Sequence, residues 1–171
     1  MNISRDREKH GLGRWAVLGL LALLSACASA PKPYALSGGT MAPYTVGGVT
    51  YQPRYQPHYN QVGLATWYGP QYQNHRTADG EIFDMDRPSG AHTTLPLPCI
   101  VEVTNLDNGR RVKLRINDRG PFVKGRILDV SLEAARELGF YGKGAVRVRV
   151  RYVGPASGPP SRVRVAEYAP F

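Results

Sequence analysis

The chain has 171 residues, 42% of them hydrophobic, and its 22 Lys and Arg residues against 13 Asp and Glu residues give a net charge of +9. One modest domain fits this length, because the commonest domain size is about 100 to 150 residues, and a large multidomain enzyme is excluded. The 19 Gly and 14 Pro residues are fewer than a low-complexity chain carries, since there the two types exceed roughly 25% of the residues. The positive charge alone would favour a nucleic acid as partner, so the compartment has to be established first.

The N-terminal residues have the pattern of an export signal. Four basic residues lie within 1–14, and an uncharged apolar run of ten residues follows at 15–24. This run is too short to span a bilayer, which needs about 20 residues. It ends in Leu24-Ser25-Ala26-Cys27, which resembles the site where bacterial lipoproteins are cleaved before a lipidated Cys. We predict a lipoprotein signal peptide over 1–26 and a lipid anchor on Cys27. The alternative is an ordinary secretory signal in which Cys27 is incidental.

The residues around the predicted anchor indicate the compartment. Ala28, and not Asp, follows Cys27, and by resemblance to lipoproteins this favours the outer membrane, facing the periplasm. Export excludes intracellular nucleic acid as a partner, so we expect the basic charge to form a solvated face or to suit an anionic envelope surface. If Cys27 is lipidated, Cys99 has no partner for an internal disulfide, and we expect it to be a small core residue.

Composition divides the rest of the chain. After the predicted lipidated Cys, the segment 27–61 is rich in Pro, Tyr, Gly and Gln and has no acidic residue, which predicts a flexible, disordered linker or tether. Two Tyr-Gln-Pro repeats within it, at 51–53 and 55–57, also fit a weak binding segment. The folded domain is predicted over 62–153. The remaining segment, 154–171, is rich in Gly and Pro and is predicted to be a C-terminal tail.

The patterns within 62–153 are mainly those of β-structure. Alternation at 101–104, a turn at 106–109 and the run 111–116 predict a hairpin. Val alternates with Arg over 145–153, which predicts a strand with one buried and one exposed face. A helix is predicted over 132–138, with Ser131 as N-cap and Gly139 at its end. Short strands around one short helix favour a small β-barrel, a fold that leaves no edge strand unpaired.

Five segments, in order, resemble the rare lipoprotein A (RlpA) family. They lie at 63–69, 76–84, 91–96, 103–110 and 116–122. The resemblance implies a six-stranded double-psi β-barrel with one or two short helices. It also implies lytic transglycosylase activity on peptidoglycan, a preference for glycan strands without stem peptides, and endolytic cleavage of the β-1,4 bond between N-acetylmuramic acid (MurNAc) and N-acetylglucosamine (GlcNAc). Many members carry a C-terminal glycan-binding repeat domain. We see no room for one after residue 153, so we expect another route of localisation.

A lytic transglycosylase must protonate the leaving oxygen and then take a proton from the C6 hydroxyl of the sugar, which closes a 1,6-anhydro ring. One carboxyl group can do both in turn, whereas a hydrolase usually needs two. The resemblance implies that Asp118 is the acid/base, with Glu81 and His92 completing the catalytic site.

Each of these residues also fits a structural role. Asp118 beside Arg119 is typical of a turn carboxylate, and Arg119 would lower its pKa. Burial or a nearby carboxylate such as Glu81 must therefore raise the pKa if Asp118 is to act as an acid. Glu81 also fits a solvated acidic loop, and His92 fits a surface or hydrogen-bonded histidine.

Candidate substrate-binding residues surround this trio. Trp67 and Tyr68 follow a predicted strand and are expected either to stack on a sugar ring or to join the core. Thr77, Asn117 and Arg119 are expected either to bond sugar hydroxyl and acetamido groups or to tie the barrel loops together. The sequence has no His/Cys zinc motif, phosphate-binding Gly-rich loop or dinucleotide motif, so we predict no metal and no cofactor.

Two other functions stay open at this point. One is a non-catalytic peptidoglycan-binding or wall-loosening lipoprotein of the expansin kind, which has the same barrel but no turnover. The other is a hydrolase that uses Asp118 and Glu81 as a pair and leaves a reducing end. The trio Glu81, His92 and Asp118 favours an enzyme over the binding module, and the product mass, which differs by one water, separates the hydrolase from the transglycosylase. We expect a monomer that binds peptidoglycan strands and the membrane, and the sequence names no divisome or amidase partner.

Overall fold

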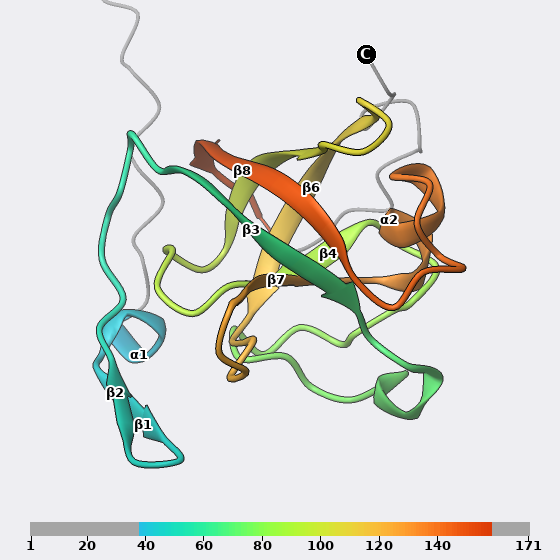
Figure 1. Ribbon diagram of the computed structural model, residues 1–171. Coiled ribbons are helices and arrows are strands. Elements are labelled where there is room, and N and C mark those ends of the chain that lie inside the picture. Colours follow the sequence, from blue (N-terminus) through green and yellow to red (C-terminus); the bar gives the residue numbers. More distant parts are fainter. Residues whose placement is uncertain (1–37, 159–171) are drawn as a thin grey trace, which may run out of the picture. The chain divides into compact units, whose positions relative to one another are not determined.

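A closed barrel of six strands forms the centre of the domain (Figure 1). The computed structural model describes residues 38–158, so the predicted signal peptide, Cys27 and residues 159–171 of the predicted tail lie outside the described residues. The barrel strands are β3 (Asn60–Trp67), β4 (Ser89–Ala91), β5 (Cys99–Asn105), β6 (Arg111–Asp118), β7 (Arg126–Val130) and β8 (Val146–Pro155). They close in the order β3-β7-β4-β6-β5-β8. This confirms the predicted mainly-β fold and six-stranded barrel.

The two clearest sequence patterns are confirmed by the strand pairing. β5 and β6 form the predicted antiparallel hairpin, with Cys99 opposite Ile116 and Thr104 opposite Arg111. In β8 Val146, Val148 and Val150 are buried, and the Arg side chains that alternate with them are exposed. β8 joins the hairpin to β3 through antiparallel pairs on both of its sides, so the barrel wall is continuous here.

Two parallel pairings complete the barrel. β3 pairs with β7 and β4 pairs with β6, while β4 and β7 pair in antiparallel fashion. Parallel neighbours need long connections, so no local turn pattern indicates them. The short strand β4 thus lies between β6 and β7, and it brings the ends of these two strands together.

The barrel interior is an apolar core of aliphatic side chains. Val101, Leu114, Leu128 and Val148 are among the fully buried residues. Cys99 is also fully buried and has a free thiol, which confirms the predicted core cysteine. Burial raises the pKa of this thiol to about 12, so it stays protonated and unreactive.

The predicted helix is confirmed as α2 (Leu132–Glu137). The Ser131 hydroxyl accepts a hydrogen bond from the Ala134 N–H at 3.2 Å, as an N-cap does. The chain leaves the helix at Gly139, whose φ of 72° favours glycine. The other helical segments are α1 (Gly38–Met41) and a 3₁₀ turn, η1 (Pro70–Tyr72). Between residues 38 and 158, no helix has the length and apolar character needed to cross a membrane.

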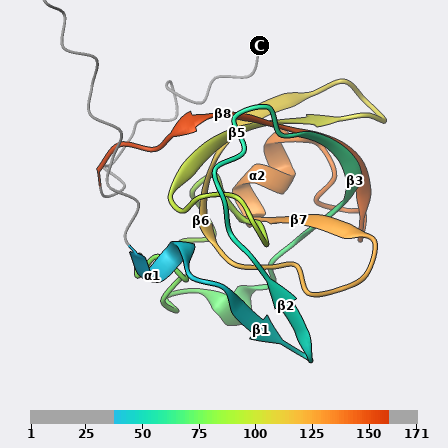
Figure 2. The same ribbon diagram turned by 90° about the vertical axis from the view of Figure 1, so that its left-hand side faces the viewer.

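Residues 38–61 differ from the flexible linker that was predicted for them. β1 (Tyr44–Val46) and β2 (Val49–Tyr51) form a hairpin through Gly47 and Gly48, whose φ values of 57° and 78° suit a tight two-residue turn. The Tyr44 hydroxyl donates to the Thr93 carbonyl at 2.8 Å. Figure 2 shows the chain running from β2 along the barrel to β3.

Residues 38–61 are ordered, and not a flexible linker, because of the kind of contact that holds them against the barrel. The segment has few aliphatic residues, so its composition is typical of a tether. Its contacts are instead made by backbone groups and tyrosine rings. The Arg54 N–H donates to the Thr94 carbonyl at 3.0 Å, and the Tyr152 N–H donates to the Tyr59 carbonyl at 3.0 Å. β3 itself begins at Asn60, two residues before the predicted start of the domain.

Candidate functional site

The site lies where β4 meets the ends of β6 and β7. Ala91 of β4 pairs with Asp118 of β6 on one side and with Asp129 of β7 on the other. Two carboxyl groups therefore flank a strand only three residues long. Tyr68 follows β3, and its backbone N–H donates to the Val130 carbonyl at 2.9 Å, which places this residue at the same end of β7.

The Asp118 carboxyl is held by one of its two oxygens. Oδ1 accepts hydrogen bonds from the backbone N–H groups of Ala78, at 2.9 Å, and Arg119, at 2.8 Å. No residue within 38–158 donates to Oδ2. Burial raises the pKa of this carboxyl, and the nearby Asp129 also raises it, while the two backbone hydrogen bonds and Arg119 oppose the rise. The carboxyl is thus fixed in place and favours its protonated form more than a solvated Asp does.

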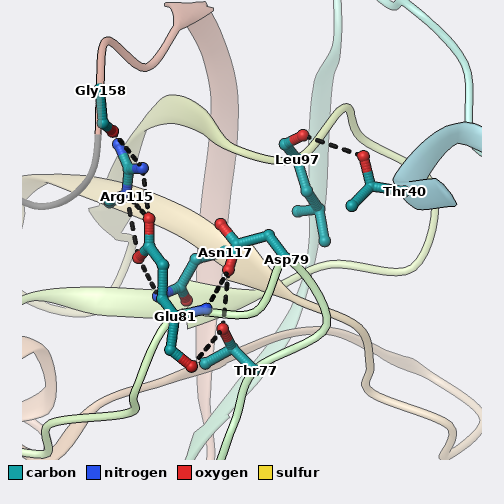
Figure 3. Close-up of polar contacts among 8 residues, drawn as sticks. All are labelled: Thr40, Thr77, Asp79, Glu81, Leu97, Arg115, Asn117 and Gly158. Atoms are coloured by element: carbon teal, nitrogen blue, oxygen red, sulfur yellow. Dashed lines mark hydrogen bonds and ion pairs between the residues drawn. The ribbon is translucent and has the colours of Figure 1, made fainter. Parts of the chain in front are cut away.

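Glu81 is part of a separate, tightly bonded cluster (Figure 3). The Arg115 Nε donates to Glu81 Oε1 at 2.9 Å, and Arg115 Nη2 forms an ion pair with the same oxygen. The Asn117 side-chain amide donates to Glu81 Oε2 at 2.9 Å. Arg115 Nη2 also donates to the Gly158 carbonyl at 2.8 Å. Because the Arg115 and Glu81 side chains are only 8% and 12% exposed, this pair is a buried anchor.

The anchor fixes the turn that supports Asp118. The Thr77 hydroxyl lies 2.7 Å from Asp79 Oδ1 and 3.2 Å from the Glu81 carbonyl oxygen, and the Glu81 N–H donates to Asp79 Oδ1 at 3.1 Å (Figure 3). Burial raises the pKa of the Asp79 carboxyl. Ala78, which bonds Asp118, lies inside this turn. The Thr77 and Asn117 side chains are both buried and tie loops together, the second of the two roles considered for them.

The hydrogen bonds of the His92 ring go to groups other than the Asp118 carboxyl. Its Nδ1 accepts hydrogen bonds from the backbone N–H groups of Thr94, at 3.1 Å, and Leu95, at 3.0 Å, so the ring proton lies on Nε2. This Nε2 is 2.8 Å from the Tyr59 hydroxyl. The side chain is 3% exposed, and burial, together with Arg119, lowers its pKa to about 3. Both ring nitrogens are therefore hydrogen-bonded within the chain. His92 contacts Asp118 through the backbone, where the His92 N–H donates to the Asp118 carbonyl oxygen at 3.1 Å.

The Arg119 guanidinium is also engaged within the chain. Nη1 donates to the carbonyls of His92, at 3.1 Å, and Leu95, at 2.7 Å, and Nη2 donates to the Thr40 carbonyl at 2.6 Å. Arg119 therefore ties the segment before β1 to the loop after β4. Its side chain holds these two segments together beside the site.

Trp67 and Tyr68, which were expected either to stack on a sugar ring or to join the core, have different surroundings. Trp67 packs against the core, and its ring centroid is 5.1 Å from that of Tyr141. The Tyr68 ring packs against Phe83 at 5.1 Å, and its buried hydroxyl has no hydrogen-bond partner within residues 38–158. Burial, together with Asp118 and Asp129, raises the pKa of this hydroxyl. It remains a hydrogen-bond donor beside the two carboxyls.

Sequence reasoning missed Asp129 and Arg115. Asp129 is 8% exposed and accepts hydrogen bonds from the Thr66 hydroxyl at 2.6 Å and the Arg126 guanidinium at 2.5 Å. Each of the two missed residues is a charged residue between apolar neighbours in a buried strand. Charged residues are almost never buried without a partner, so this pattern was the available signal. Among residues 38–158, no group of three or more His, Cys, Asp or Glu side chains is arranged to hold a metal ion.

The chain resembles known proteins over the whole barrel. Residues 60–150 match the family model for lytic transglycolases. The chain is 45% identical over 138 residues to the endolytic peptidoglycan transglycosylase RlpA of Pseudomonas aeruginosa (strain UCBPP-PA14). The match covers 80% of this chain and 40% of that protein. It is 40% identical over 147 residues to the protein of the same name from Neisseria meningitidis serogroup B, with 85% of this chain and 62% of that protein covered.

The solved structures give a lower level of likeness. A Clavibacter michiganensis expansin is 22% identical, with a TM-score of 0.44, and the match covers 59% of this chain and 54% of the expansin. This likeness is too low to inform the function. The chain spans 40% and 62% of the length of the two relatives named above. Because the family model covers more than half of the chain, from residue 60 to residue 150, this protein belongs to the lytic transglycolase family, and its relatives named RlpA agree with the resemblance to rare lipoprotein A.

Proposed function

We propose that this protein is an endolytic lytic transglycosylase that cleaves the MurNAc–GlcNAc β-1,4 bond of peptidoglycan, preferring peptide-free strands. The observation that carries the proposal is the state of Asp118. Its Oδ1 is fixed by two backbone N–H groups, its Oδ2 accepts no hydrogen bond from residues 38–158, and burial raises its pKa. The printed names of the two relatives, both endolytic peptidoglycan transglycosylases, support the same reaction and substrate.

In this mechanism, protonated Asp118 gives its proton to the glycosidic oxygen, and the bond between that oxygen and C1 of MurNAc breaks. The Asp118 carboxylate then takes the proton of the MurNAc C6 hydroxyl, and the C6 oxygen bonds to C1. The products are a strand with a free hydroxyl and a strand that ends in 1,6-anhydro-MurNAc. The carboxyl regains its proton and no water is consumed. A raised pKa favours the first step, since a general acid works best with a pKa near the working pH.

The other predicted catalytic residues support Asp118 by position. Glu81, held by Arg115 and Asn117, fixes the turn whose Ala78 N–H bonds Asp118. The His92 backbone bonds the Asp118 carbonyl. We assign both residues to positioning. Tyr68 is the substrate-binding candidate that we retain, because its buried hydroxyl has no hydrogen-bond partner within residues 38–158. It would donate to a sugar oxygen once strand binding opens the loop that covers it.

A hydrolase would need a second carboxyl with access to a water molecule or to the sugar. Both Glu81 oxygens accept hydrogen bonds from Arg115 or Asn117, and the Asp129 Oδ1 is held by Thr66 and Arg126. Asp129 is ion-paired with Arg126, whereas the groups within residues 38–158 that bond the Asp118 carboxyl are backbone N–H groups. A single acid/base at Asp118 suits the transglycosylase better, because the C6 hydroxyl of the substrate takes the place of the water that a second carboxyl would activate.

We also propose the cellular setting from the sequence pattern. A signal peptide over 1–26 is removed, Cys27 is lipidated, and the monomeric protein is anchored in the outer membrane, facing the periplasm. Peptidoglycan lies within reach of an anchor there. Metabolic labelling with a radioactive fatty acid, compared between the wild type and Cys27→Ala, tests the anchor.

The experiment that tests the reaction is mass spectrometry of soluble products from sacculi and from amidase-treated, peptide-free strands. We expect 1,6-anhydro ends, with faster release from the peptide-free strands. Reducing ends, heavier by one water, would show a hydrolase. Retained binding to sacculi without any product would show a binding module of the expansin kind.

A further inference from the structure

Three aromatic rings border the proposed catalytic site, and they come from two separate parts of the chain. Tyr44 of β1 and Tyr51 of β2 lie opposite each other in the hairpin and stack with ring centroids 5.3 Å apart. Phe122, in the loop between β6 and β7, lies 5.5 Å from the Tyr51 ring and 6.2 Å from the Tyr44 ring. These three rings are called the aromatic wall below.

The aromatic wall begins next to Asp118. The Arg119 guanidinium carbon lies 5.7 Å from the centre of the Tyr44 ring, and Arg119 directly follows Asp118. The Asp118 carboxyl is close enough to add to the effect of burial in raising the pKa of the Tyr44 hydroxyl. The hydroxyl itself donates to the Thr93 carbonyl, which holds the hairpin in place beside the site.

The hairpin presents two chemically different faces. Tyr44, Val46, Val49 and Tyr51 share one face by their pairing, and on the other face the Thr45 and Thr50 hydroxyls are 3.0 Å apart. Val49 and Phe122 are 53% and 44% exposed, so part of the apolar surface faces solvent. No charged residue occurs between residues 38 and 53.

This chemistry suits a strand of sugar rings. The C–H groups on the faces of a pyranose ring pack against flat aromatic rings, and the hydroxyl and acetamido groups at the ring edges can bond nearby polar side chains. A nucleic acid or another phosphate polymer would call for Lys and Arg on the surface, and the hairpin has none. The wall is linked to the place of the proposed reaction through Arg119, which follows Asp118 and lies over the Tyr44 ring.

We propose that the aromatic wall is a subsite for the glycan strand, which holds sugar rings beyond the two that flank the cleaved bond. The inference rests on the proposed function, because the strand bound at the wall is the strand cleaved at Asp118. Affinity would then grow with strand length, which makes long glycan strands better substrates than short fragments.

The test uses the full-length chain with the substitutions Tyr51→Leu and Phe122→Leu combined, which keep apolar packing but remove the flat rings. Tyr55→Leu is the matched control, because Tyr55 is 61% exposed and its ring contacts Tyr152 at 5.9 Å, outside the wall. Cleavage kinetics are measured on long peptide-free strands and on a tetrasaccharide. Binding of the long strands is measured by calorimetry in an Asp118→Asn background, and thermal unfolding checks that every variant is folded.

We expect the double variant to raise KM and Kd for long strands roughly tenfold, with kcat and the tetrasaccharide kinetics unchanged. The control should match the wild type. Equal KM and Kd in folded double variant and wild type would overturn the inference while leaving the proposed function intact. Loss of binding to phosphatidylglycerol vesicles, with strand binding retained, would overturn it in favour of a lipid contact. If the wild type makes no anhydro product but strand binding still weakens in the double variant, the proposed reaction fails and the subsite stands.

Discussion

The buried ring of His92 predicts a stability that depends on pH. The pKa of an unperturbed His is about 6.5, and burial lowers that of His92 to about 3. The unfolded chain therefore binds a proton at His92 below about pH 6.5, while the folded chain binds one only near pH 3. Since the unfolded state holds more protons in this window, the free energy of unfolding falls as the pH is lowered through it.

The magnitude follows from the same two values. Each pH unit inside the window contributes about 1.4 kcal/mol, so lowering the pH from 7 to 5 removes about 2 kcal/mol of stability through His92 alone. The assay is urea unfolding of the wild type and of His92→Gln at both pH values. The difference between the two proteins isolates His92, because all other groups titrate in both. An equal loss of stability in the two proteins would refute the reasoning.

Three further substitutions test the framework around the site. Arg115→Met leaves Glu81 buried without its cation and should lower the free energy of unfolding by about 3–5 kcal/mol. Combining Arg115→Met with Glu81→Leu should restore much of that free energy. Chemical denaturation measures the stability of the single and the double variant. Tyr68→Phe should leave the free energy of unfolding unchanged or raise it by about 1 kcal/mol, because an unpartnered buried hydroxyl is removed. If that hydroxyl bonds the substrate, kcat/KM falls about tenfold. Equal kcat/KM in Tyr68→Phe and the wild type would contradict the role assigned to Tyr68. Ser131→Ala should destabilise the protein by about 1 kcal/mol through loss of the α2 N-cap, and no change in the unfolding midpoint would show that the cap bond is unimportant.

The antiparallel part of the barrel could be predicted because its signals are local. The turn between β5 and β6 lies within a few residues of both strands, and the Val/Arg alternation of β8 follows directly from one buried and one exposed face. The parallel pairs β3–β7 and β4–β6 join strands that are distant in the chain. Neither their pairing nor the closure of the barrel has a local sequence signal.

For the candidate site, the sequence supplied residues to propose but not the bonds that those residues make. The family resemblance identifies Asp118, Glu81 and His92, but it does not show that both His92 nitrogens and both Glu81 oxygens are bonded within the chain. Those bonds depend on partners far away in sequence, such as Tyr59 and Arg115. The hairpin at 44–51 was missed for a related reason, since its contacts are tyrosine rings and backbone groups, and not an aliphatic face.

The most direct test of the central claim is the release of anhydro ends by two matched Asp→Asn variants. Asp118→Asn removes the proposed acid/base, and Asp107→Asn removes an exposed carboxyl that lies 3.9 Å from Lys143 in a distant turn. We predict that Asp107→Asn releases 1,6-anhydro products from peptide-free strands at the wild-type rate, while Asp118→Asn, equally well folded, releases none. Undiminished anhydro release by Asp118→Asn would contradict the account.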